Sequence, residues 1–180
     1  MKPFQFEIFE KLLSEVEPTT IAEIGVHSGN TARQLISYCL KNFNKPLHYT
    51  GYDAFDLLVD HDSELNGKGS ANRYRLQIKL DKTKRDHPNS QLTTEIIEGW
   101  TKNTLTISRQ FDFVYIDAGH SYESVKHDYE MLKDSKIIVF DDYDMPGVKQ
   151  LLDEIALTKK IEYTENTEHS RAVAIIRNYE

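Results

Sequence analysis

One segment of the sequence combines glycines with an acidic residue in a pattern that suits ligand binding by the backbone. Residues 23–29 read Glu-Ile-Gly-Val-His-Ser-Gly, so Gly25 and Gly29 closely follow an apolar run. Glycine lets a backbone approach a ligand more closely than other residues do. Because three residues separate the two glycines, the segment does not match the G-x-G-x-x-G dinucleotide fingerprint, which disfavours a nicotinamide dehydrogenase. The alternative is a tight turn that simply contains two glycines.

Carboxylates follow two other apolar runs further along the chain. Asp117 comes directly after the run 113–116, and Asp141 and Asp142 come after the run 137–140. If both runs are neighbouring parallel strands, these carboxylates converge and repel one another unless a cation or protons lie between them. Oxygen ligands of this kind suit a hard divalent ion, and Mg²⁺ is the expected one. The alternative is that these aspartates form turns or cap the following helices.

The elements that must position these residues alternate along the chain. Apolar runs predict seven strands, at 20–26, 47–53, 95–98, 111–117, 136–141, 160–165 and 171–177. Apolar residues at helical spacing predict a leading helix at 3–17 and further helices at 29–43, 101–109, 122–132 and 146–155. We expect Ser28 and Asp144 to cap the second and the last of these helices. The alternation predicts a doubly wound α/β fold with a mostly parallel seven-stranded sheet and an antiparallel edge strand, which binds ligands beyond the carboxyl ends of its strands.

Residues 57–92 interrupt this regular alternation. Their hydrophobic periodicity is weak, polar residues dominate, and the segment is too long for an ordinary connection. We therefore expect a lid or insertion here. Within it, Arg73, Tyr74 and Arg75 are candidates for contacting an anionic or sugar-like substrate, and a solvated helix face is the alternative interpretation.

Length and composition exclude several classes of protein. A chain of 180 residues predicts a single domain, 1–180. The net charge of -7 disfavours sequence-independent binding to nucleic acid phosphates. Cys39 is the one cysteine, so neither an internal disulfide nor a multi-cysteine metal site can form, and we expect it to be buried. Charges throughout the first twenty residues argue against a signal peptide, and no apolar stretch reaches the roughly 18 residues of a membrane span. We expect a cytoplasmic protein with a small-molecule partner; the oligomeric state stays open.

The glycine segment and Asp53, which follows the next predicted strand, resemble the cofactor-binding motif of class I S-adenosylmethionine-dependent methyltransferases. The resemblance implies that the glycine turn lies against the methionine part of the cofactor and that Asp53 binds the ribose hydroxyls, since a carboxylate accepts two hydrogen bonds. It also implies that Gly99 and Trp100 lie at the adenine, although Trp100 would also suit a core position. The expected cofactor-binding residues are Glu23, Gly25, His27, Gly29, Asp53, Gly99, Trp100 and Asp117.

A narrower resemblance covers residues 20–177. Residues 117–123 and 141–148 are similar to the D-G-x-H-x-Y-E and D-D-Y-x-x-P-G-V segments of metal-dependent methyltransferases that modify sugar hydroxyls of natural products, and of their small relatives. The resemblance implies that Mg²⁺ binds to Asp117, Asp141 and Asp142, and that the catalytic residues are Asp117 and His120, the latter as general base. The chain departs from the pattern at Ala118, where a glycine is usual, and we expect none of the added domains that bind large substrates in the natural-product enzymes.

These features together predict an S-adenosylmethionine-dependent enzyme that performs Mg²⁺-assisted O-methylation of a small hydroxylated substrate. Two alternatives remain open from the sequence. The first is a methyltransferase-like module that binds the cofactor without catalysis, and the second is a metal-independent methyltransferase. The sequence does not identify the methyl acceptor.

Overall fold

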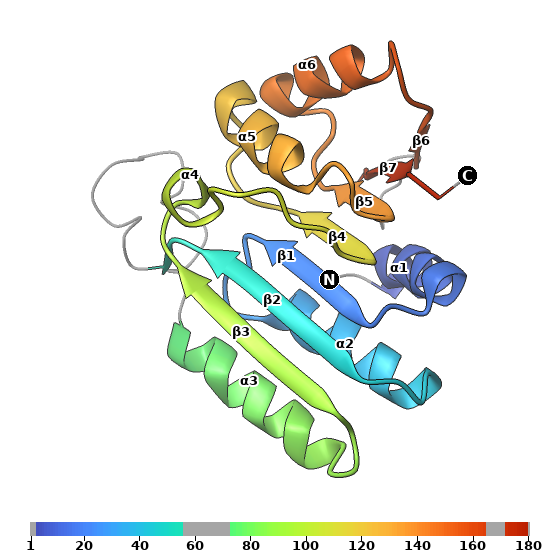
Figure 1. The fold of residues 1–180 in the computed structure, drawn as a ribbon, viewed down its shortest axis with the longest axis vertical. Coiled ribbons are helices and arrows are strands. Elements are labelled where there is room, and N and C mark those ends of the chain that lie inside the picture. Colours follow the sequence, from blue (N-terminus) through green and yellow to red (C-terminus); the bar gives the residue numbers. More distant parts are fainter. Residues whose placement is uncertain (1–2, 56–72, 165–171, 180) are drawn as a thin grey trace.

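A single mixed sheet forms the centre of the computed structural model, which describes residues 3–55, 73–164 and 172–179 (Figure 1). Its strand order is β3-β2-β1-β4-β5-β7-β6. The strands are β1 (Thr20–Ile24), β2 (Leu47–Asp53), β3 (Leu92–Glu98), β4 (Phe113–Ile116), β5 (Ile137–Phe140), β6 (Ile161–Tyr163) and β7 (Ala174–Arg177). Strands β1 to β5 pair in parallel, while β7 runs antiparallel to both β5 and β6. The predicted doubly wound, mostly parallel sheet is confirmed, and the antiparallel strand lies one position in from the β6 edge.

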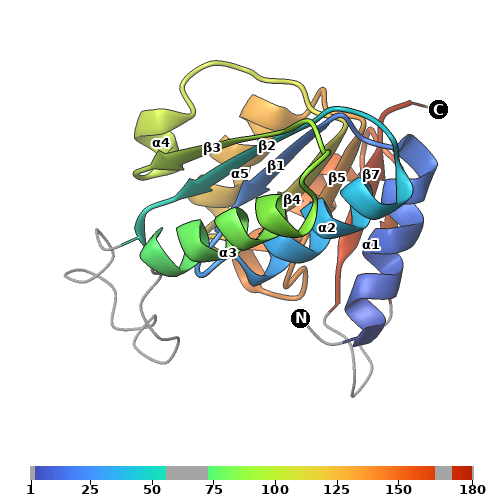
Figure 2. The same ribbon diagram turned by 90° about the horizontal axis from the view of Figure 1, so that it is seen from below.

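Helices cover both faces of the sheet, as Figure 2 shows. They are α1 (Pro3–Val16), α2 (Asn30–Asn42), α3 (Arg73–Asp86), α4 (Thr101–Thr104), α5 (Tyr122–Leu132) and α6 (Pro146–Ile155). Helices α1 to α3 share one buried apolar layer with Tyr49 and Tyr115, and Cys39 lies in it as expected. Helices α5 and α6 share the other layer with Ile24 and Ile116. Successive strand residues therefore point into opposite layers, which makes both faces of the sheet core. No described helix combines the length and the apolar character that crossing a membrane requires.

Helix α3 accounts for much of the segment that the sequence pattern left irregular. Leu76 and Leu80 are buried one helical turn apart, whereas Tyr74 is 75 % exposed and Ile78 is 46 % exposed. Apolar side chains on the solvent side obscure the helical periodicity, so the pattern suggested an insertion where a connecting helix lies. Arg73 forms an ion pair with Glu98 at the end of β3. The part of the expected lid at 57–72 lies outside the described residues, so the lid stays a prediction.

Two helix caps differ from expectation. The N-cap of α2 is Gly29, not Ser28, and the N-cap of α6 is Met145, not Asp144; neither cap makes a side-chain hydrogen bond. A left-handed backbone at Gly29 (φ 73°) carries the chain into α2. At α6, Pro146 occupies the first turn, where a missing backbone N–H costs nothing because it has no partner within the helix.

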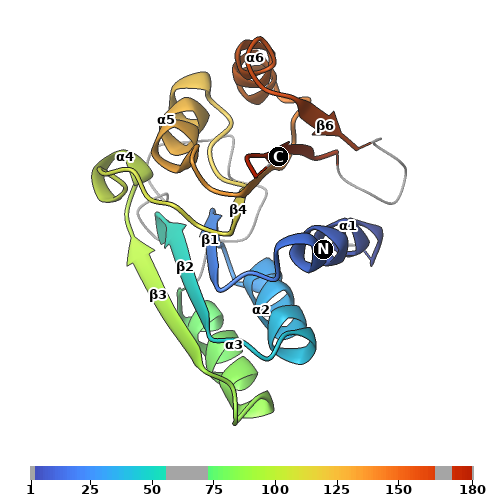
Figure 3. The same cartoon turned by 45° about the vertical axis from the view of Figure 1, so that its right-hand side comes forward.

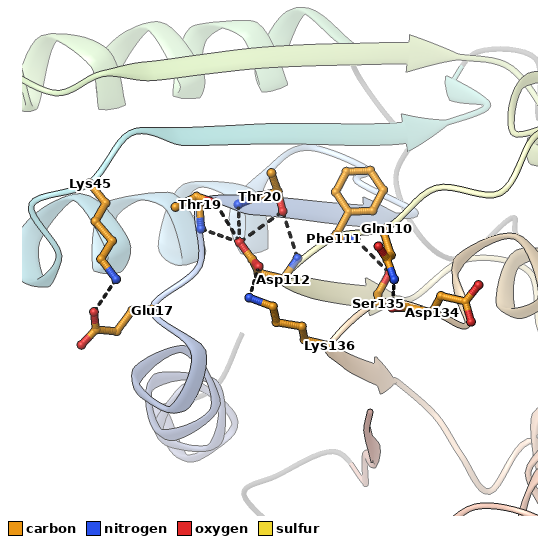
Figure 4. A network of polar contacts seen from close by, with 10 residues as sticks. All are labelled: Glu17, Thr19, Thr20, Lys45, Gln110, Phe111, Asp112, Asp134, Ser135 and Lys136. Carbon is orange, nitrogen blue, oxygen red and sulfur yellow. Dashed lines mark hydrogen bonds and ion pairs between the residues drawn. The ribbon is translucent and has the colours of Figure 1, made fainter. Parts of the chain in front are cut away.

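The amino ends of β1 and β4 are joined by the Asp112 carboxylate (Figure 4). Its Oδ2 accepts hydrogen bonds from the backbone N–H of Thr19 (2.8 Å) and Thr20 (3.1 Å) and from both hydroxyls, while Lys136 Nζ lies 2.7 Å from Oδ1. Burial raises the pKa of Asp112, but the hydrogen bonds from Lys136, Thr19 and Thr20 outweigh it and lower this pKa to about 2. The contact sets the relative position of the two strands whose opposite ends carry the candidate site.

We expect Asp112→Ala to lower the free energy of unfolding by about 2 kcal/mol at pH 7, because two backbone N–H groups lose their acceptor. The folded-state pKa is depressed, so this stabilisation is present above the unfolded pKa of about 3.9 and is lost as the pH falls toward 2. Thermal melting of both proteins at pH 7 and pH 2.5 measures the effect. Asp153→Ala, which removes an exposed carboxylate on α6, is the matched control. If the two proteins differ in melting temperature as much at pH 2.5 as at pH 7, the stabilisation does not come from the ionised carboxylate.

Candidate active site

The turn after β1 is packed backbone to backbone against the end of β4. Gly25 has φ 90°, and its N–H donates to Tyr52 O at 2.8 Å. A Cβ atom at Gly25 would lie 2.0 Å from Asp117 O, and one at Gly29 would lie 2.4 Å from the Leu76 side chain. Both glycines of the sequence motif are therefore required by the positive φ angles and by close neighbours. This turn lies between β1 and β4, where the strand order reverses and doubly wound sheets bind ligands.

Asp53, the last residue of β2, lies beside this turn. Its Oδ2 accepts a hydrogen bond from the backbone N–H of His27 at 2.6 Å, and its Oδ1 accepts one from Phe55 N–H at 2.6 Å. His27 is held at φ 52°, and its side chain is exposed. Each carboxylate oxygen can accept a second hydrogen bond. The structure thus brings Asp53 and the turn together, and binding of a ribose diol by this carboxylate, which is 8 % exposed, stays a prediction.

Glu23 lies beneath the turn rather than on its surface. The residue is 1 % exposed, and its Oε2 accepts a hydrogen bond from Tyr49 Oη at 2.6 Å. Burial raises the pKa of Glu23 to about 8; the Tyr49 hydrogen bond opposes the rise, and the charges of Asp117 and Asp53 add to it. Its carboxyl group therefore supports the turn from within the core, and a direct contact with a cofactor stays a prediction.

The end of β3 adds Gly99 and Trp100 to the same edge of the sheet. Gly99 has φ 134°, and its N–H donates to Asp53 O at 2.9 Å, which ties the ends of β2 and β3 together. Trp100 is the N-cap of α4 and is 39 % exposed. The alternative of a core tryptophan is therefore wrong, and a contact of Trp100 with adenine stays a prediction.

Asp117, His120 and Asp142 converge at the ends of β4 and β5. One potential ligand atom from each lies within 4.8 Å of those of the other two. His120 Nε2 is 3.3 Å from Asp142 Oδ2, and both side chains are 26 % exposed. Backbone hydrogen bonds from Asp117 N to Ile24 O (2.8 Å) and from Asp141 N to Ile116 O (2.9 Å) extend the strand ladders up to these residues. The expected convergence of carboxylates is thus observed for Asp117 and Asp142.

Asp141 does not belong to this group, although its carboxylate shares the Tyr115 hydroxyl with Asp117. It is 2 % exposed, and Tyr115 Oη lies 2.9 Å from its Oδ2 and 3.3 Å from Asp117 Oδ2. Burial, followed by the charges of Asp117 and Asp141, raises the pKa of Tyr115, so the phenol stays protonated and can donate. The sequence interpretation missed Tyr115 because it reads as part of an apolar strand. Its position two residues before Asp117, and so on the same face of β4, was the available signal.

The strand order, the glycine turn and the acidic residue after β2 define a class I S-adenosylmethionine-dependent methyltransferase. A family model described as a methyltransferase domain matches residues 22–143. The chain belongs to this family. A search among curated proteins gives no match.

Several solved structures share the fold. CalS11, a TDP-rhamnose 3'-O-methyltransferase in calicheamicin biosynthesis, has a TM-score of 0.71 and 18 % identity, with 98 % of this chain and 80 % of CalS11 covered. The O-methyltransferase NovP has a TM-score of 0.68 and 16 % identity, with 97 % and 79 % covered. An O-methyltransferase from Bacillus cereus in complex with SAH has a TM-score of 0.65 and 13 % identity, with 99 % and 82 % covered. At these identities the likeness establishes the fold.

Proposed function

We propose that the protein transfers the methyl group of S-adenosylmethionine to a hydroxyl oxygen of a small substrate, assisted by a divalent cation such as Mg²⁺. The observation that carries this proposal is the convergence of Asp117, His120 and Asp142 at the sheet edge that also bears the glycine turn and Asp53. The names of CalS11 and NovP, both O-methyltransferases, support transfer to oxygen.

The cofactor would lie along the carboxyl ends of β1, β2 and β3. The turn from Gly25 to Gly29 would meet the methionine part, where the lack of side chains allows close approach. Asp53 would accept hydrogen bonds from the ribose hydroxyls, and the exposed indole of Trp100 would stack on the adenine. The hydrogen bond between Gly99 N and Asp53 O would fix the position of the proposed adenine site relative to the proposed ribose site.

The donor groups at the ends of β4 and β5 fit a hard divalent cation. Asp117 and Asp142 supply carboxylate oxygens, which such ions prefer, and a cation between them would relieve their mutual repulsion. When bound, the ion would lower the pKa of the substrate hydroxyl and fix its direction. The sequence resemblance adds Asp141 to the ligands. In the structure Asp141 contacts Tyr115, so we propose that it holds Asp117 in place through the shared phenol.

His120 is the proposed general base. The substrate oxygen would attack the methyl carbon in line with the carbon–sulfur bond, which breaks and leaves S-adenosylhomocysteine as a neutral thioether. The hydroxyl proton would pass to the imidazole of His120. Asp142 Oδ2, 3.3 Å from His120 Nε2, would stabilise the resulting imidazolium.

Titration of the protein with S-adenosylhomocysteine by calorimetry tests the cofactor site. We expect binding, and we expect Asp53→Ala to weaken it by about 1 to 3 kcal/mol, because the ribose loses its acceptor and two turn N–H groups lose theirs. Asp153→Ala, which removes an exposed carboxylate of α6, should bind as the wild type does. Failure to bind at millimolar ligand, or equal affinity of the Asp53→Ala variant, would refute this site.

A further inference from the structure

Helix α4 is too short to hold its own position. It spans four residues, Thr101–Thr104, and an isolated turn of helix is not stable in water. It nevertheless carries Trp100 at its N-cap, next to the proposed adenine site. Figure 3 shows α4 lying beside α5, and two neighbouring residues of α5, His127 and Asp128, face it.

His127 contacts both ends of the short helix. Its Nε2 lies 3.2 Å from Thr101 O, at the first helical residue, and 3.1 Å from Leu105 O, at the C-cap. Both partners are carbonyl acceptors, so this nitrogen must carry the proton. One imidazole ring therefore joins the two ends of α4 to α5.

Asp128 is buried beside the same turn. The residue is 1 % exposed, and neither carboxyl oxygen has a partner at good hydrogen-bond geometry among the described residues, although the Thr101 side chain lies near. A buried carboxylate with so few hydrogen bonds destabilises the folded protein, because it has lost its hydration. The protonated carboxyl has no charge to bury and can donate to the Thr101 hydroxyl. Burial, the largest influence, raises the pKa of Asp128 to about 6, while Thr101 and the charge of His127 act in the lowering direction. No charged side chain of the described parts of β4 or α6 contributes.

We propose that His127 and Asp128 are positioning residues that clamp α4 and thereby hold Trp100 in place for the adenine ring. The role assigned to Trp100 rests on the proposed function, whereas the clamp itself does not. When Asp128 ionises, its buried carboxylate lacks hydration. Movement of α4 away from α5 would let water reach this carboxylate, so ionisation favours that movement. Cofactor affinity should therefore fall as the pH rises through about 6.

Trp100 is the one tryptophan of the chain, so its fluorescence reports on α4 directly. We would measure emission and acrylamide quenching of the cofactor-free protein from pH 5 to pH 8. Quenching of the wild type should rise with a midpoint near 6, whereas Asp128→Asn, which imitates the protonated carboxyl, should keep the low-pH value throughout. His127→Ala should be strongly quenched at every pH. Glu130→Gln, a change on α5 at a carboxylate that pairs with Lys133, is the matched control and should follow the wild type.

Affinity for S-adenosylhomocysteine should weaken roughly three- to tenfold between pH 5 and pH 8 in the wild type and stay constant in Asp128→Asn, the size expected for one hydrogen bond. A wild-type fluorescence that does not change with pH, or an Asp128→Asn variant that titrates like the wild type, would overturn the clamp. Melting curves confirm that each variant is folded. If the wild type does not bind S-adenosylhomocysteine, the proposed function fails, and the fluorescence titration still decides on the clamp.

Discussion

Gly25→Ala is expected to abolish detectable binding of S-adenosylhomocysteine, a loss of about a hundredfold or more in affinity. The added Cβ would lie 2.0 Å from Asp117 O and 2.6 Å from Asp117 C, which are backbone atoms and cannot rotate away as a side chain does. The φ of 90° adds strain for any residue with a Cβ. Relief requires that the turn and the end of β4 separate, which displaces the proposed cofactor surface and Asp117 together.

Calorimetric titration and thermal melting of Gly25→Ala measure these effects. Gly119→Ala is the matched comparison, because Gly119 is exposed and a Cβ there would meet the Ser124 side chain at 2.9 Å, which can change rotamer. We expect Gly119→Ala to melt close to the wild type and Gly25→Ala to melt well below it. Normal binding by Gly25→Ala would show that the cofactor does not use this turn.

Removal of the divalent cation is expected to abolish turnover. Activity should vanish in chelator and return with Mg²⁺ or Mn²⁺, and Asp142→Asn should lower turnover by about a hundredfold or more. Cofactor binding should largely survive, because Asp53 and the glycine turn do not belong to the Asp117, His120 and Asp142 group. The stability of metal-free Asp142→Asn should equal or exceed that of the wild type, because a charge beside Asp117 is removed.

Three variants separate the roles of Asp142, His120 and Asp141. Titration with Mn²⁺ should show weaker binding for Asp142→Asn, nearly unchanged binding for His120→Gln, and an intermediate loss for Asp141→Asn, whose effect would pass through Tyr115. His120→Gln should still lose turnover, because it removes the proton acceptor. Full activity in chelator, or an unimpaired Asp142→Asn enzyme, would show that the carboxylates are structural and would favour a metal-independent transferase.

Several features of the fold follow from local sequence. Helices α1 and α2 were predicted to within a residue or two because their apolar residues repeat at the helical period of 3.6. Strand β2 was predicted at its observed bounds as one of the buried runs of the sheet. Helix α3 was missed because exposed Tyr74 and Ile78 break that period, and only packing of Leu76 and Leu80 shows which side is buried. The caps at Gly29 and Met145 were misassigned because backbone conformation and Pro146, rather than a polar side chain, begin those helices.

The sequence by itself determined the order of the strands and of the described helices other than α3, and it indicated which strand ends carry glycines and carboxylates, because both depend on residue type and local periodicity. Tertiary structure decided which of these groups meet. Asp141 and Asp142 are consecutive, yet one contacts Tyr115 in the core and the other contacts His120, because the chain has left β5 and Asp142 adopts a left-handed backbone (φ 47°). The clamp of α4 by His127 and Asp128 likewise depends on packing between α4, which follows β3, and α5, which follows β4, two strands that are not neighbours in the sheet. Such contacts depend on how elements pack, which no local pattern in the sequence records.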